Sequence, residues 1–252
     1  MQNSGIKTLL HRHKAWHVLS TRVIYQAKPW VELSIQRVRL PDGRVVEDYH
    51  QIRLPEYCMV FAETTEGMVI AARQYRHGVG GECITLPAGL IEESEQALEA
   101  MKRELLEETG YTADDWKSLG SYVPNSNYGC GKAHLFSASD ARYVKEPCSG
   151  DLEESEVLLL TRDEIFQTIS EGRIASLSMV AAVSLATNPH FTRGAHAPAC
   201  SRWRLADGLG VNGSDSVMKV VGASSGRGAQ SGTRARVRSP KQACKISVLA
   251  FA

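Results

Sequence analysis

The chain has 252 residues, of which 43% are hydrophobic and 7% aromatic, a composition typical of one or two globular domains. No apolar run approaches the roughly 20 residues that a membrane-spanning helix needs, so we expect no membrane insertion. The net charge of +1 conceals an asymmetry. Residues 1–190 carry 19 Lys and Arg against 26 Asp and Glu, a net −7, whereas residues 191–252 carry 10 against 2, a net +8. We therefore expect different physical roles for these two segments.

The start of the chain and its cysteines bear on cellular location. Residues 1–19 lack the apolar core of a secretory signal. The six cysteines form no CxxC pair, which favours reduced thiols over a disulfide framework or a zinc site. We expect a cytoplasmic protein, and the absence of acidic residues before Glu32 leaves targeting to an organelle as the alternative.

Residues 16–52 predict an antiparallel β-meander. Apolar and polar residues alternate in segments 17–26, 29–40 and 45–54, and the second is rich in β-branched and aromatic types. The sequence PDG at 41–43 is typical of a hairpin turn between the second and third strands.

Two stronger strands are predicted at 57–61 and 68–72, because both are apolar on both faces, as in the centre of a sheet. A turn at Glu66-Gly67 joins them. The sequence RQYR then ends at Arg76, and LPAG ends at Gly89, where a glutamate-rich segment begins.

That segment predicts a helix between Ser94 and Gly110. Ser94 can cap the N-terminus, and Gly110 suits the left-handed position that follows many helices. At about 100° per residue, one arc of the helix is apolar and should face the core; it consists of Ala97, Leu98, Met101 and Leu105.

Three glutamates should project near the rim of this arc, namely Glu104, Glu107 and Glu108. Unpaired carboxylates there would be costly and would repel one another. A divalent cation resolves both problems, and oxygen ligands on one helix face suit Mg²⁺, which takes substrate phosphates as further ligands. Arg103 can pair with Glu99 or Glu107, each four residues away.

Beyond the helix, strands are predicted at 118–123 and 133–138, with a turn-rich loop between them. An acidic stretch at 150–156 precedes a strand at 157–160. We interpret this acidic stretch either as a surface loop without a specific role or as a functional loop.

Two helices and a tail complete the chain. The sequence TRDE at 161–164 is a capping box, and Gly172 should end the helix that it starts. Residues 174–187 are apolar nearly all round, which predicts a largely buried helix. From His190 onwards no helical or strand period is present, and we predict a basic, disordered tail over 191–252.

The fixed residues between Gly89 and Tyr111 resemble the complete signature of the Nudix hydrolases. Gly89 is followed after five residues by Glu95 and, after seven more, by RELLEETGY; we call residues 89–111 the Nudix box. The spacing of RQYR and LPAG resembles the ADP-ribose pyrophosphatase branch of the family. That branch usually carries a proline about fifteen residues past its box, whereas Pro124 lies thirteen past Tyr111.

The resemblance implies an α/β (α+β) fold, the Nudix α/β/α sandwich with a mixed sheet, plus an N-terminal antiparallel β-meander. We divide the chain into a meander at 1–56, a Nudix hydrolase domain at 57–190 and a basic tail at 191–252. Members of this branch commonly dimerise through their N-terminal strands, so we expect a homodimer.

The resemblance also implies the site residues. A divalent metal, Mg²⁺ or alternatively Mn²⁺, would be held by the carbonyl of Ala88 and by the carboxylates of Glu104, Glu107 and Glu108, of which Glu104 and Glu108 are also assigned as catalytic. Glu95 and Arg103 would hold the geometry of the loop and the helix.

A general base and two arginines complete the expected site. In the family, a glutamate of the loop before the last strand can act as general base, and here Glu153 and Glu154 are equal candidates. Arg76, from the RQYR resemblance, and Arg53, from its place after a strand, are candidates to bind a diphosphate bidentately. For Arg53 a surface ion pair is an equal alternative.

The implied activity is hydrolysis of a nucleoside diphosphate linked to another moiety, with ADP-ribose cleaved to AMP and ribose 5-phosphate. The alternatives are another nucleotide-sugar, such as GDP-mannose, and a catalytically silent nucleotide-binding module, which would not need three crowded carboxylates. The tail is either an appendage without a specific role or an electrostatic contact for nucleic acid or another polyanion.

Overall fold

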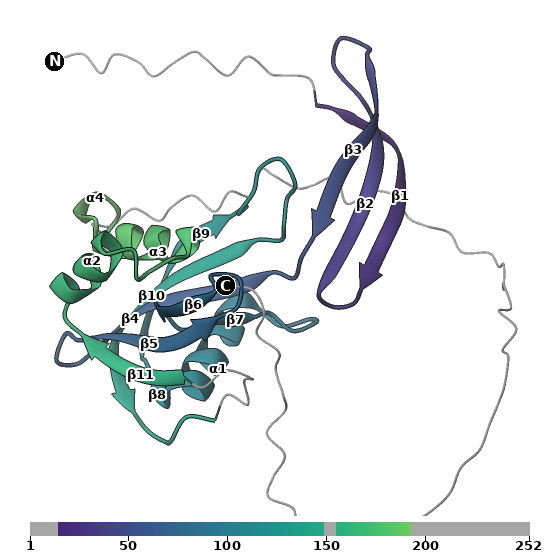
Figure 1. The fold of residues 1–252 in the computed structure, drawn as a ribbon. Coiled ribbons are helices and arrows are strands. Elements are labelled where there is room, and N and C mark those ends of the chain that lie inside the picture. The colour runs from purple at the N-terminus through teal and green to yellow at the C-terminus, as the bar shows by residue number, and fades with distance from the viewer. Residues whose placement is uncertain (1–14, 149–154, 193–252) are drawn as a thin grey trace, which may run out of the picture.

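The N-terminal strands form a sheet of their own, which extends beside the rest of the molecule (Figure 1). The computed structural model describes residues 15–148 and 155–192. The strands β1 (His17–Ala27), β2 (Val31–Arg39) and β3 (Val45–Arg53) pair antiparallel in the order β1-β2-β3. The Gly43 N–H donates to the Leu40 carbonyl at 3.0 Å, and this turn closes the β2–β3 hairpin. The predicted β-meander is confirmed.

A second, mixed sheet of eight strands forms the body of the protein. Its main path runs β11-β5-β4-β10-β8, with β6 on β5, β7 on β4 and β9 on β10. Strand β10 runs parallel to β4, and the other pairs are antiparallel. The strands are β4 (Tyr57–Thr64), β5 (Val69–Arg76), β6 (Gly81–Thr85), β7 (Ala88–Leu90), β8 (Tyr111–Thr112), β9 (Asp115–Tyr122), β10 (Ala133–Tyr143) and β11 (Ser155–Leu160).

Helices cover both faces of this sheet (Figure 1). Helix α1 (Ala97–Thr109) lies on one face, and α2 (Arg162–Ser170) and α3 (Leu177–Thr187) lie on the other; the short α4 (Pro189–Thr192) follows α3. This arrangement confirms the predicted α/β/α sandwich.

Strand β4 separates the two cores, because its side chains alternate between the faces. Met59 and Phe61 join the cluster beneath α2 and α3. Cys58 and Val60 join the cluster beneath α1. Burial of a large apolar side chain contributes roughly 1.5–3 kcal/mol, so the apolar β4 fixes the helices on both faces.

The predicted start of the box helix is wrong, whereas its end is confirmed. Helix α1 begins three residues after Ser94, and its N-cap is Gln96, which makes no side-chain capping bond. Ser94 has a φ of +68° and lies in a loop that a glutamate–arginine pair holds in place. Gly110 follows the helix with a φ of +76°, and its N–H donates to the Leu106 carbonyl.

The C-terminal helices agree only in part with expectation. The capping box is present, because the Thr161 hydroxyl accepts from the Glu164 N–H and the Glu164 carboxylate accepts from the Thr161 N–H. Helix α3 is largely buried, as predicted, with Met179, Ala182, Val183 and Ala186 in the core, but it begins at Leu177, which is 79% exposed. Its uniform apolar composition concealed which face meets the sheet.

Two expectations about compartment can be compared with the described residues. Cys58, Cys83 and Cys130 are free thiols, in agreement with the expectation of reduced thiols for these three residues. Among the described helices, none has the length and apolar character to cross a membrane.

Candidate active site

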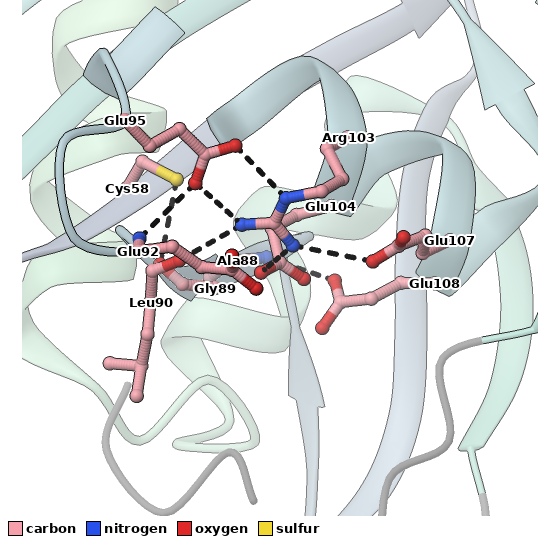
Figure 2. Close-up of polar contacts among 10 residues, drawn as sticks. All are labelled: Cys58, Ala88, Gly89, Leu90, Glu92, Glu95, Arg103, Glu104, Glu107 and Glu108. Carbon is pink, nitrogen blue, oxygen red and sulfur yellow. Dashed lines mark hydrogen bonds and ion pairs between the residues drawn. The ribbon is translucent and has the colours of Figure 1, made fainter. Parts of the chain in front are cut away.

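Arg103, in the middle of α1, binds the loop that precedes the helix (Figure 2). Its Nε and Nη2 donate to the two oxygens of Glu95 at 3.0 and 2.9 Å. Its Nη2 also donates to the Leu90 carbonyl at 3.2 Å. These hydrogen bonds lower the pKa of Glu95, and the same pairing raises the pKa of Arg103. The predicted role of Glu95 and Arg103 in holding the loop against the helix agrees with these contacts.

Glu104 is buried, with only 4% of its surface exposed, and lies against Gly89. A Cβ atom built on Gly89 would come closer than 3.0 Å to three atoms of the Glu104 side chain. Gly89 is therefore required by close approach rather than by an unusual backbone angle. The Glu104 Oε1 accepts from Arg103 Nη1 at 2.7 Å, which compensates the buried charge.

Glu107 and Glu108 are consecutive in α1 and bind different partners. The Glu107 Oε2 is 3.3 Å from Arg103 Nη1, which partly confirms the predicted pairing, whereas Glu99 pairs with Lys102. The Glu108 Oε2 accepts from the Ala88 N–H at 3.0 Å. Helix α1 and strand β7 are thus connected at both Glu104 and Glu108.

Cys58 was not anticipated as a neighbour of the site. Its thiol donates to the Gly89 carbonyl at 3.4 Å. Burial, followed by the charge of Glu104, raises the pKa of Cys58 to about 12. The alternation of β4 could have placed Cys58 on the α1 face, but no sequence signal specified that it faces Gly89.

The candidate ligand atoms of the site are of the type that a hard divalent cation binds. Every candidate ligand is an oxygen, supplied by Glu104, Glu107, Glu108 and the Ala88 carbonyl. One guanidinium nitrogen of Arg103 already lies between Glu104 and Glu107, so a positive charge occupies the place where two carboxylates would repel. Within residues 15–148 and 155–192, however, no three His, Cys, Asp or Glu side chains are close enough together to hold a metal ion in this conformation.

Arg76 ends β5 and is only 8% exposed. With the Gln74 amide oriented to satisfy its hydrogen bonds, the Gln74 oxygen accepts from Arg76 Nη2 at 2.7 Å and from the Thr85 hydroxyl at 2.6 Å. Gln74 orients the guanidinium from two residues away on the same strand face. The strand period could have indicated this neighbour.

Arg53 is placed differently. It ends β3 in the N-terminal sheet, with its side chain 80% exposed, and its Nε lies 3.8 Å from Glu32 Oε1. Arg53 thus forms a surface ion pair with Glu32, which is the alternative that the sequence left open for this residue. A role for Arg53 in substrate binding stays a prediction.

Glu153 and Glu154 lie outside the described residues, but both flanking segments are described. On one side, the Cys148 N–H donates to the Glu107 carbonyl at 2.7 Å. On the other side, Ser155 pairs with Gln74 in the β11–β5 ladder.

Two family models match the sequence of this chain. The NUDIX domain matches residues 55–177, and the nucleoside diphosphate sugar hydrolase N-terminal domain matches residues 16–52. A methanol dehydrogenase activator from Bacillus methanolicus is 33% identical over 61% of this chain and 83% of its own. The chain belongs to the Nudix family. The predicted Nudix hydrolase class is thereby confirmed, and Nudix hydrolases are in general dependent on divalent metals.

Two further similarities concern this Nudix protein's branch and fold. An ADP-ribose pyrophosphatase from Bacillus subtilis (strain 168) is 26% identical over 57% of this chain and 78% of its own length. A crystal structure of an ADP compounds hydrolase covers 69% of this chain and 92% of its own, with a TM-score of 0.59 and 18% identity. The latter supports the fold alone. The former agrees with the predicted ADP-ribose pyrophosphatase-like branch.

Proposed function

We propose that this protein is a Mg²⁺-dependent hydrolase that cleaves the diphosphate of ADP-ribose, or of a related nucleotide-sugar, to a nucleoside monophosphate and a sugar phosphate. One observation carries the proposal: Arg103 binds both the buried Glu104 and Glu107, and the Ala88 N–H of β7 binds the next residue, Glu108. Arg103 offsets part of this negative charge, and a divalent cation would neutralise the rest. The name of the Bacillus subtilis relative supports ADP-ribose as the substrate to test first.

In this mechanism, Glu104, Glu107, Glu108 and the carbonyl of Ala88 would hold Mg²⁺, or Mn²⁺ in its place. The bound ion would neutralise phosphate charge and make a bound water more acidic. Gly89 allows Glu104 to lie directly against β7, and the Ala88 N–H holds Glu108 there. Arg103 binds Glu104 and Glu107 and thereby limits the movement of both side chains.

Either Glu153 or Glu154 would accept the proton of the attacking water as its oxygen bonds to phosphorus and the bridging P–O bond breaks. The flanking contacts support this assignment. Residues 149–154 connect a segment bound to Glu107 with a strand residue paired with Gln74. Six residues span at most roughly 25 Å, so both glutamates are tethered between the box helix and the strand that carries Arg76.

Arg76 is our candidate to bind the diphosphate. Burial and the Gln74 contact fix the direction of its guanidinium, and a fixed planar fork matches two phosphate oxygens. Arg53 is the secondary candidate, because it is exposed and its pairing with Glu32 is long.

We also propose that the protein is a homodimer through β1. Four large apolar side chains of this edge strand are exposed: Val18, Val23, Ile24 and Tyr25. A second copy would cover them and remove the open strand edge. A Val23→Glu substitution should convert the dimer to a monomer in light scattering, whereas a wild-type protein that is already monomeric would contradict the proposal.

The cellular location and the role of the basic tail are the last parts of the proposal. We retain a cytoplasmic location, with an organelle as the alternative. Of the basic segment 191–252, the structure describes only residues 191 and 192, which end α4, so contact with nucleic acid through this segment stays a prediction. Salt-sensitive binding to DNA or RNA that disappears on deletion of 191–252 would support that contact.

The experiment that tests the function is a substrate panel. The purified chain is incubated with Mg²⁺ and, separately, with ADP-ribose, GDP-mannose and other nucleotide-sugars, and the nucleoside monophosphate released is measured. We expect ADP-ribose to be cleaved with the highest kcat/KM. A preference for GDP-mannose would replace the substrate but keep the mechanism. Ligand binding without turnover would establish the silent-module alternative instead.

A further inference from the structure

A polar cluster outside the Nudix box surrounds Glu56, the residue before β4. The His134 Nε2 is 2.8 Å from Glu56 Oε2, and the Lys132 Nζ is 3.3 Å from Glu56 Oε1. The Ser121 hydroxyl lies 2.9 Å from His134 Nδ1. The imidazole is thus held between a hydroxyl and a carboxylate, and the carboxylate is held by two partners.

The cluster connects the β9–β10 hairpin to the start of β4. His134 and Ser121 are cross-strand partners, and the Lys132 carbonyl accepts from the Tyr57 N–H at 3.0 Å. Burial would raise the pKa of Glu56, but the hydrogen bond from His134 and the charge of Lys132 outweigh it, and the pKa is lowered. The carboxylate is therefore held as an anion between its two basic neighbours.

The main chain of Glu56 reaches the Nudix box directly. Its carbonyl accepts from the Ile91 N–H at 3.1 Å, one residue after β7 ends. This bond extends the β4–β7 ladder, in which Tyr57 pairs with Leu90 and Cys58 with Gly89. The Leu90 carbonyl in turn accepts from Arg103. Glu56 therefore binds β10 through its side chain and the box through its backbone.

We propose that Glu56 is a positioning residue for the divalent-metal site. Its carboxylate, fixed by His134 and Lys132, holds the backbone that sets where β7 and the following loop lie relative to the glutamates of α1. This inference rests on one part of the proposed function, namely that the Nudix box binds a metal ion, and it does not depend on which substrate is cleaved. In this role Glu56 acts through the backbone and not as a ligand of the ion.

The test is the metal affinity of the full chain, measured by titration with MnCl₂ and detection of free Mn²⁺ by electron paramagnetic resonance. Glu56→Gln keeps the size of the side chain and removes its charge. We expect this variant to bind Mn²⁺ about 10-fold more weakly, at the lower end of the effect of outer partners on metal sites. The Mg²⁺ concentration for half-maximal activity should rise by a similar factor, with kcat at saturating Mg²⁺ changed less than about 2-fold.

The matched control is Glu63→Gln. Glu63 lies towards the other end of β4 and binds Arg162 through two hydrogen bonds of 2.6 Å, so the control also loses a charged pair on the same strand. Its Mn²⁺ affinity should equal that of the wild type. A general loss of stability would instead lower the unfolding temperatures of both variants and leave both affinities unchanged.

A folded Glu56→Gln variant with wild-type Mn²⁺ affinity would overturn the proposal, and so would a wild-type chain that binds no Mn²⁺ at millimolar concentration. If Glu56→Gln fails to fold, the Lys132→Gln variant replaces it in the titration. Its Mn²⁺ affinity should be weaker by about 2- to 3-fold, the size of one exposed ion pair. An unchanged Mn²⁺ affinity in Lys132→Gln would overturn the proposal. If the wild type binds Mn²⁺ but cleaves no nucleotide-sugar, the proposed function fails while the Mn²⁺ titrations still decide the role of Glu56.

Discussion

A single methyl group added at Gly89 should disable the site. In Gly89→Ala, the new Cβ would lie closer than 3.0 Å to three atoms of the Glu104 side chain. Carbon atoms in contact normally lie about 3.5–4.0 Å apart, so the carboxylate must move by at least about 0.5–1 Å. Glu104 is buried and bonded to Arg103, so this movement disturbs the whole cluster.

Both activity and stability should respond. A misplacement of about 1 Å at a catalytic group costs on the order of 100-fold, and we expect kcat/KM to fall by about that factor. Overpacking of a filled site destabilises by about 1–3 kcal/mol. The assays are release of AMP from ADP-ribose with Mg²⁺ and denaturant unfolding. Gly78→Ala is the matched control, because nothing lies within 4 Å of a Cβ at Gly78.

A double-mutant cycle isolates the contact. Once Glu104→Ala has removed the opposing side chain, Gly89→Ala should no longer reduce stability, so the two effects should not add. Wild-type kcat/KM and stability in Gly89→Ala, or equal stability costs in the presence and absence of the Glu104 side chain, would refute the proposed contact.

Two further predictions follow from the contacts and pKa shifts around the box. Arg103 lowers the pKa of Glu95 in the folded state from its usual value of 4.5, so the contribution of Glu95 to stability is present above pH 4.5 and is lost as the pH falls towards the folded-state pKa. Glu95→Gln should therefore remove part of the acid dependence of the free energy of unfolding, measured between pH 6 and 3. An unchanged acid dependence would contradict this. Cys58 is fully buried and its pKa is raised to about 12, so iodoacetamide should modify Cys58 at pH 8 only after the protein unfolds, as measured by mass spectrometry. If Cys58 in the native protein reacts as fast as the partly exposed Cys130, the thiol is accessible and the prediction is wrong.

Much of the fold could be predicted because local patterns agreed with one another. The alternation in β1, β2 and β3, the turn at Gly43 and the capping box at Thr161 each depend on near neighbours in sequence. The box glutamates were found because their spacing is that of one helix face. Such features need no knowledge of long-range contacts.

The errors arose where distant contacts decide local structure. Ser94 has the composition of a helix cap, but the Glu95–Arg103 pair holds the preceding residues in a loop, so α1 begins later. Helix α3 lacks a polar face from which its orientation could be read.

The contacts of Glu56 with His134 and Lys132 also escaped prediction. They join residues more than 70 positions apart, and no periodicity within either segment could indicate them.

We expect the glutamates of α1 to bind the metal that hydrolysis requires, and the Glu108→Gln variant is the test. The control is Glu99→Gln on the same helix, whose carboxylate pairs with Lys102 at the surface. With ADP-ribose and Mg²⁺, we predict that Glu108→Gln lowers kcat/KM by on the order of 100-fold or more, whereas Glu99→Gln retains it. Equal activities of Glu108→Gln and wild type would contradict the account.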